Sequence, residues 1–304
     1  MSKLSEPLKA FINASHARPN TVPAPKQITS IYERIANEAS TKQVGLPAWL
    51  CASTAATMTM NSPDSLLALY ALATSPQHNN NSSSSSSSNG KPSNHSLYTA
   101  ELMREVGLKC IGFNGVPRTI NCLGAFHSGL PAEIQHELSK RQPRRHLTST
   151  NIDATLRRGH SLWESIYRPF ADKLTSKLAQ SHPDLPVHII ESEYGCLFSD
   201  PAMPEGGRDP APVGRVLTSV IAVACLRSQT GVGPQVVSHV FGLRKAFEDG
   251  SAEGEQSIEG GKWLASDEGS MWLLQSVDRI VEAIGGARGT TFAPGMEKEL
   301  KAKL

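Results

Sequence analysis

The chain has 304 residues, enough for one larger domain or two small ones with a sizeable core. Its 30 basic and 28 acidic side chains give a formal net charge of +2, which offers no reason to expect nucleic acid or an anionic membrane surface as a partner. The five cysteines form no CxxC pair and no zinc-site spacing, and no stretch reaches the roughly 18 apolar residues of a membrane span. The composition therefore predicts no metal site and no membrane span, and it suits a reducing compartment.

The N-terminal part is expected to be an extension followed by helices. Residues 1–40 are predicted to form this extension with a short helix, and they lack the apolar core of a secretory signal. Helices are expected within 46–60 and 62–74, the second with Ser62 as its N-cap. The Ser- and Asn-rich run at 78–96 offers no apolar side chain to bury, so it is predicted to be a disordered insertion.

Helical periodicity continues along the rest of the chain. One apolar face runs through 151–180, where Pro169 is expected to kink or split the helix. The segment 183–201 is ambiguous between helix and strand, and Tyr194 within it is expected to pack and to make one hydrogen bond. A loop rich in proline and glycine follows, and then further helical patterns up to about residue 286.

Two segments share the pattern of an apolar helix, a glycine turn and a helix that begins at proline. They are LKCIGFNGVPRTINCLGAF at 108–126 and GRVLTSVIAVACLRSQTGVGPQVVSHVFGLRKAF at 214–247, and Pro117 of the first aligns with Pro234 of the second. Glycine suits the left-handed end of one helix, and proline suits the first turn of the next. We therefore expect an all-α fold made of a duplicated helical hairpin, occupying 41–290 with pseudo-repeats at about 45–180 and 185–290.

These two segments resemble the hairpins of alkylhydroperoxidase D-like proteins, the superfamily that includes carboxymuconolactone decarboxylases, and they are most similar to fungal members found in peroxisomes. The resemblance implies a duplicated all-helical fold and a homo-oligomer. In the peroxidase branch, the turn and second helix carry CxxCxxxH, a redox-active cysteine pair followed by a histidine. Val232 and Gln235 stand at the two cysteine positions here, so only His239 remains and the peroxidase chemistry does not transfer.

The decarboxylase branch needs no cysteine pair, which leaves four candidate catalytic residues around the turns. His239 is the candidate acid or base, Gln235 lies one helical turn before it, Arg227 could hold a substrate carboxylate together with Arg244, and Arg118 is the fourth candidate. Each also has a structural interpretation: His239 as a buried core residue, Gln235 as a partner for free backbone groups at the helix start, and the arginines as capping or ion-pairing groups. Both interpretations stay open at this point.

The C-terminal residues predict a subcellular location. Residues 291–304 are expected to be an exposed tail, and its last three residues, Ala302, Lys303 and Leu304, resemble the Ser-Lys-Leu peroxisomal signal. An import receptor reads such a tripeptide through its terminal carboxylate and its leucine side chain. The sequence therefore predicts a protein of the peroxisomal matrix.

Three functions are compatible with these observations. The first is a cysteine-independent enzyme acting on a small carboxylated or oxidised metabolite, and the second is a non-catalytic oligomeric or binding protein. The third is a thiol-dependent antioxidant peroxidase that uses other cysteines. None of them calls for a cofactor. The expected partners are the peroxisomal import receptor, a small-molecule ligand and further copies of the chain.

Overall fold

A computed structural model describes residues 4–78, 92–202, 211–253 and 257–286. Every regular element in these ranges is a helix and none is a strand, so the prediction of an all-α fold is confirmed. Most of the predicted insertion at 78–96 lies outside the described residues, and so does the predicted signal Ala302, Lys303 and Leu304.

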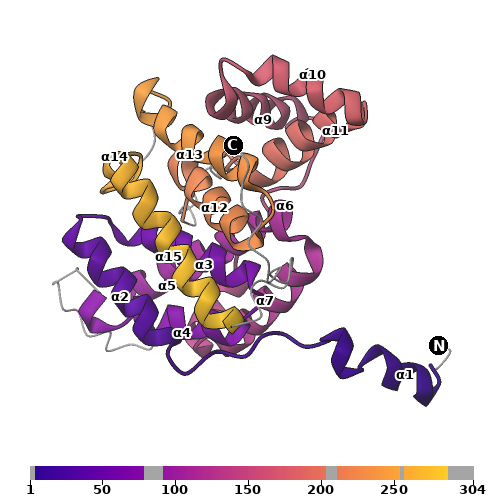
Figure 1. Ribbon diagram of the computed structural model, residues 1–304, viewed down its shortest axis with the longest axis vertical. Coiled ribbons are helices and arrows are strands. Elements are labelled where there is room, and N and C mark those ends of the chain that lie inside the picture. The colour runs from indigo at the N-terminus through magenta and orange to yellow at the C-terminus, as the bar shows by residue number, and fades with distance from the viewer. Residues whose placement is uncertain (1–3, 79–91, 203–210, 254–256, 287–304) are drawn as a thin grey trace, which may run out of the picture.

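Two helices with almost no exposed side chains form the centre of the molecule. They are α3 (Leu46–Thr59) and α12 (Gly214–Gln229), which pack against each other (Figure 1). Because apolar and small side chains occupy nearly all of their positions, both helices need cover from other helices. That cover is supplied by α2 (Ile28–Thr41), α4 (Pro63–Ala73), α5 (Asn94–Lys109), α7 (Val116–Gly129), α13 (Gly233–Glu248) and α15 (Asp267–Gly285).

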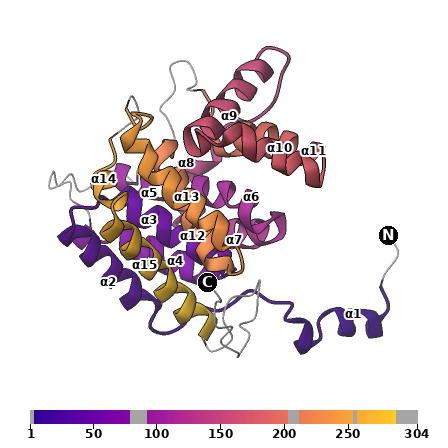
Figure 2. The same ribbon diagram turned by 45° about the horizontal axis from the view of Figure 1, so that its top comes forward.

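The packed body begins earlier than the sequence predicted. The helix α1 (Glu6–Ile12) buries no residue and stands apart from the body (Figures 1 and 2). The helix α2, by contrast, buries Tyr32, and the Tyr32 hydroxyl lies 2.6 Å from Thr57 Oγ1 of α3. The extension was placed at residues 1–40, but the apolar face of α2 is one wall of the core, so the packed body starts near residue 28.

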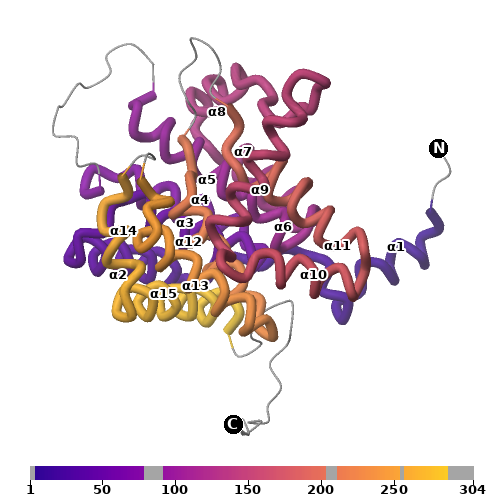
Figure 3. Tube along the Cα trace, turned by 90° about the horizontal axis from the view of Figure 1, so that it is seen from above, coloured from indigo at the N-terminus to yellow at the C-terminus, as the bar shows by residue number. Residues whose placement is uncertain are grey.

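A separate lobe lies beside this body and has its own apolar cluster around Trp163 (Figure 3). Pro169 splits the long pattern as expected, because one helix ends at Tyr167 and the next begins at Ala171. A Cβ atom on Gly159 would lie 2.6 Å from the Cα of Gly195, so these glycines allow two helices to pack backbone against backbone. The lobe consists of α9 (Ile152–Tyr167), α10 (Ala171–Ser181), α11 (Asp184–Val187) and the π-helix η3 (His188–Phe198).

The remaining elements connect these parts. The helix α5 begins at Asn94 with the Ser93 hydroxyl accepting from the Ser96 amide, so the last residues of the segment predicted to be disordered are helical. Within the described ranges, no helix combines the length and the apolar content needed to cross a membrane. The connecting elements are η1 (Ser15–Ala17), η2 (Pro76–His78), α6 (Ile111–Asn114), α8 (Ala132–Ser139) and α14 (Gly261–Leu264).

The turns of the two predicted hairpins meet in the core. The Sγ atoms of Cys110 and Cys225 are 3.5 Å apart, and Gln229 Nε2 donates to Asn114 Oδ1 at 3.4 Å. The two residues of each pair are 115 positions apart, whereas Pro117 and Pro234 are 117 apart, so the helices before the turns match with a shift of two residues. This arrangement agrees with two related hairpins, although the duplication itself stays a prediction.

Candidate functional site

A buried chain of hydrogen-bonding groups lies between the lobe and α13. His239 is 5% exposed, and its Nε2 lies 3.2 Å from the Tyr167 hydroxyl. The Tyr167 hydroxyl is in turn 3.0 Å from the hydroxyl of Tyr194. Three elements, α9, η3 and α13, each supply one member, and η3 is a π-helix, a conformation that is rare in proteins and frequent at functional sites.

Local packing turns His239 toward this chain. The buried face of α13 contains His239, Leu243 and Ala246 at helical spacing. A Cβ atom on Gly242 would lie 2.9 Å from Ile166 Cγ2, so the glycine lets α9 approach α13 closely. His239 therefore faces the end of α9 instead of solvent.

Burial keeps the imidazole neutral. Desolvation by burial and, to a smaller extent, the positive charge of Arg215 together lower the pKa of His239 to about 4. Burial also raises the pKa of Tyr167 and of Tyr194 above the usual tyrosine value. At neutral pH all three members of the chain are therefore uncharged.

The chain admits two arrangements of its protons. If Tyr194 donates to Tyr167 and Tyr167 donates to His239 Nε2, the imidazole carries its proton on Nδ1. If both hydrogen bonds reverse, Nε2 is the donor and Nδ1 becomes an acceptor. Among the described residues, His239 Nδ1 has no hydrogen-bond partner, so no group at Nδ1 selects one of the two tautomers.

Arg215, which the sequence analysis did not single out, joins the three helices around this chain. Its Nε donates to Ser165 Oγ at 2.8 Å, and its guanidinium also donates to Ser219 Oγ and to the Gly242 carbonyl, both at 2.6 Å. Arg215 is 3% exposed and lines a polar pocket of about 600 Å³ together with Arg158. The sequence offers only one basic residue at the start of an apolar helix, and nothing there indicates that it is buried.

The other predicted site residues lie elsewhere. Gln235 is exposed near the start of α13. Arg227 forms a two-pronged ion pair with Asp278 of α15, at 2.8 and 2.7 Å, on the surface. Arg118 donates to the carbonyl oxygen of Thr59 at the end of α3. These hydrogen bonds join neither arginine to His239, and the catalytic roles of Gln235, Arg118 and Arg227 stay predictions.

Four of the five cysteines, all except Cys196, are buried in the core. Burial raises the pKa of the Cys122 thiol to about 12 and raises that of Cys110 well above the usual value, which disfavours the reactive thiolate. Cys122 is the residue that aligns with His239, and its Sγ lies 3.8 Å from Asn61 Oδ1. No cluster of His, Cys, Asp and Glu in the described ranges has an arrangement that could hold a metal ion.

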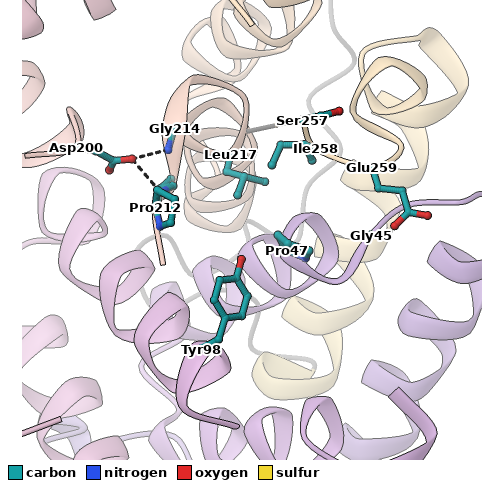
Figure 4. Close-up of a pocket in the computed structure, with 11 residues that line it drawn as sticks. Gly45, Pro47, Tyr98, Asp200, Pro212, Gly214, Leu217, Ser257, Ile258 and Glu259 are labelled. Atoms are coloured by element: carbon teal, nitrogen blue, oxygen red, sulfur yellow. Dashed lines mark hydrogen bonds between the residues drawn. The ribbon is translucent and has the colours of Figure 1, made fainter. Parts of the chain in front are cut away.

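Two further cavities are lined by described residues. A groove of about 440 Å³ is lined by Tyr167, Phe170 and Phe241, so the middle residue of the hydrogen-bonded chain also borders this groove. A smaller pocket of about 340 Å³ contains Asp200, whose Oδ2 accepts from the amides of Val213 and Gly214 at 2.9 and 2.7 Å (Figure 4). Because Asp200 also binds the buried Lys109 ammonium, this carboxylate holds the fold together.

Comparisons with protein-family models, with curated proteins and with solved structures find no match to this chain. The resemblance to alkylhydroperoxidase D-like proteins therefore stays a prediction from the two hairpin segments.

Proposed function

We propose that this protein is a cysteine-independent enzyme that transfers a proton on a small carboxylated or oxidised metabolite, with His239 and Tyr167 as its acid–base pair. The observation that carries the proposal is the buried chain from Tyr194 through Tyr167 to His239, whose middle member also lines a groove. The resemblance to the decarboxylase branch, which works without a cysteine pair, supports the same reading. A homo-oligomer in the peroxisomal matrix belongs to this proposal as well.

The charges around His239 explain why the imidazole would become an effective base only when a ligand is bound. In the free protein the imidazole is a weak base, because burial and the charge of Arg215 both disfavour imidazolium. A ligand carboxylate beside Tyr167 would offset that positive charge and raise the pKa of His239. Tyr167 could then accept a proton from the ligand while its own proton moves to His239 Nε2.

A metabolite-depletion assay tests the proposal. Purified protein is added to a peroxisomal extract, and mass spectrometry follows all small carboxylated and oxidised compounds. We expect the wild type and the Arg227→Ala variant to deplete the same compound, and the His239→Gln variant to leave it unchanged with its helix content intact. Equal depletion by His239→Gln would contradict the role of the imidazole.

A non-catalytic binding protein is the second candidate, and one observation favours it. His239 is almost completely buried and does not itself line the groove beside Tyr167, as expected for a polar residue that fixes the packing of the lobe. This function predicts that no compound in the extract is depleted by the wild type.

The location is tested separately. The tail Ala302, Lys303 and Leu304 supports peroxisomal import, so a fluorescent fusion placed N-terminal to the chain should reach peroxisomes. Deleting Leu304 should leave the fusion in the cytosol, and continued import would show that another signal operates.

A further inference from the structure

The groove beside Tyr167 has an apolar floor formed where two helices of the lobe meet α13. Ile166 lies at the end of α9, Phe170 and Leu174 lie one turn apart at the start of α10, and Phe241 projects from α13. The groove measures about 440 Å³, which is within the usual size range of small-molecule sites.

Its aromatic side chains are exposed to an unusual degree. Phe170 is 67% exposed and Phe241 is 59% exposed, although both line the same groove. Leaving a phenylalanine side chain in water instead of burying it forgoes about 1.5–3 kcal/mol. Two such rings in one concave site indicate a surface that is covered by an apolar ligand.

The rim of the same groove is cationic. Lys173 and Lys177 lie one turn apart on α10, and Lys245 projects from α13, where its ammonium donates to the Arg168 carbonyl. None of the described residues that line the groove is acidic. An apolar floor with lysines on its rim matches a ligand that has a hydrocarbon chain and one anionic head.

We infer that the groove binds a free aliphatic monocarboxylate, with its chain against Phe170, Leu174 and Phe241 and its carboxylate at Lys173 and Lys177. A neutral lipid would leave the lysines without a counter-charge, and a polyanion such as a nucleotide would leave the phenylalanines uncovered. The inference rests on the proposed function for its claim that this ligand is the substrate class, whereas the claim of binding stands on the groove alone.

Calorimetric titration of the full chain with decanoate tests this binding. We expect saturable binding at one site per chain, and binding of decyltrimethylammonium, which has the same chain and the opposite charge, weaker by about tenfold or more. Lys177→Glu and Phe241→Ser should each weaken decanoate binding by a similar factor of about ten. Both residues are exposed, so the variants should fold, and Lys262→Glu is the matched control because Lys262 is exposed and lies outside the groove.

Several results would overturn the inference. One is the absence of saturable decanoate binding, and another is equal binding by Lys177→Glu and Lys262→Glu. Without decanoate binding, sedimentation of the protein with anionic vesicles that Phe241→Ser abolishes would assign the groove to a membrane surface. A concentration-dependent dimer lost in Phe241→Ser would then assign it to a second copy of the chain.

The same titration separates this inference from the proposed function. If the wild type and His239→Gln bind decanoate equally and neither depletes any metabolite, the inferred binding site is supported and the proposed enzymatic function is contradicted. If the wild type depletes a metabolite through His239 but binds no decanoate, the inference fails and the enzyme stands.

Discussion

The two helical hairpins have similar backbones and different chemistry. In the first, Gly115 ends α6 at φ 79° and ψ 162°, and in the second, Thr230 ends α12 at φ 64° and ψ 163°. After these turns, each hairpin buries one residue at the aligned position, Cys122 in the first and His239 in the second. The backbones therefore place both side chains inward, and the difference lies in what covers them.

The covering elements decide which hairpin can do acid–base chemistry. The first hairpin is covered by α4 of the main body, and the Cys122 thiol, a weak donor, lies 3.8 Å from Asn61 Oδ1. The second is covered by α9 of the lobe, which presents the Tyr167 hydroxyl to His239. A polar group at the same helix position thus becomes part of a hydrogen-bonded chain only where the lobe packs.

The largest expected effect tests whether the two hairpins are packed equally well. Phe126 and Leu243 occupy aligned, fully buried positions, at 1% and 0% exposure. Replacing either with Ala should lower the free energy of unfolding by about 3–5 kcal/mol for the phenylalanine and about 2–5 kcal/mol for the leucine. Urea denaturation measures both, and a loss below about 1 kcal/mol in one hairpin would show that it is loosely packed.

The next prediction distinguishes the two hairpins by the pH dependence of the free energy of unfolding. The pKa of His239 is lowered to about 4 in the folded protein, so between its ordinary value and pH 4 the unfolded chain binds more protons than the folded one. Stability should therefore fall by about 3 kcal/mol on acidification through this window. In His239→Gln that contribution should vanish, and in Cys122→Ala it should persist, because the Cys122 thiol stays protonated throughout. Equal pH dependence in all three proteins would contradict the buried neutral imidazole.

A smaller effect concerns the turn residues. Thr230 has a backbone conformation that is essentially restricted to glycine, and Gly115 supplies that glycine in the first hairpin. Thr230→Gly should raise the thermal midpoint. The relief of backbone strain should exceed the entropy cost of the more flexible glycine and leave a net gain of about 1 kcal/mol in stability. Gly115→Thr should do the opposite. A lower midpoint in Thr230→Gly would mean that the strain is absent.

The smallest effect concerns a predicted site residue that lies away from His239. The Arg227 and Asp278 side chains are 46% and 47% exposed, so their ion pair is screened by water. Arg227→Ala should cost about 0.2–1 kcal/mol. A loss of several kcal/mol, seen in the same urea titration, would show that the pair is more important to the packing of α12 and α15 than its exposure indicates.

The sequence predicted the helical fold and His239, but not the partners of His239. Periodicity located α9 and the break at Pro169, and Tyr194 makes its one hydrogen bond as expected. Tyr167 and His239 are 72 residues apart, and no local pattern could bring them together. The segment containing Tyr194 looked ambiguous because a π-helix follows the periodicity of neither an α-helix nor a strand.

The position of the two predicted arginines in the sequence did not reveal their contacts either. Arg118 and Arg227 were chosen because they lie near the turns in sequence, whereas the arginine near His239 is Arg215, at the opposite end of α12. The lobe meets α13 where Ile166 of α9 packs against Gly242, and Arg215 binds both Ser165 of the lobe and the Gly242 carbonyl. Such tertiary contacts leave no signature in a single sequence.

The ionisation of His239 is the most direct test of the account, because every proposed role of the site depends on it. NMR titration of the folded protein, with the His239 signal identified by its loss in His239→Gln, measures this ionisation without any substrate. We predict a neutral imidazole at pH 7 that takes up a proton only near pH 4, and a midpoint that shifts in Tyr167→Phe. A midpoint near the ordinary histidine value of about 6.5, unchanged in Tyr167→Phe, would contradict the buried chain.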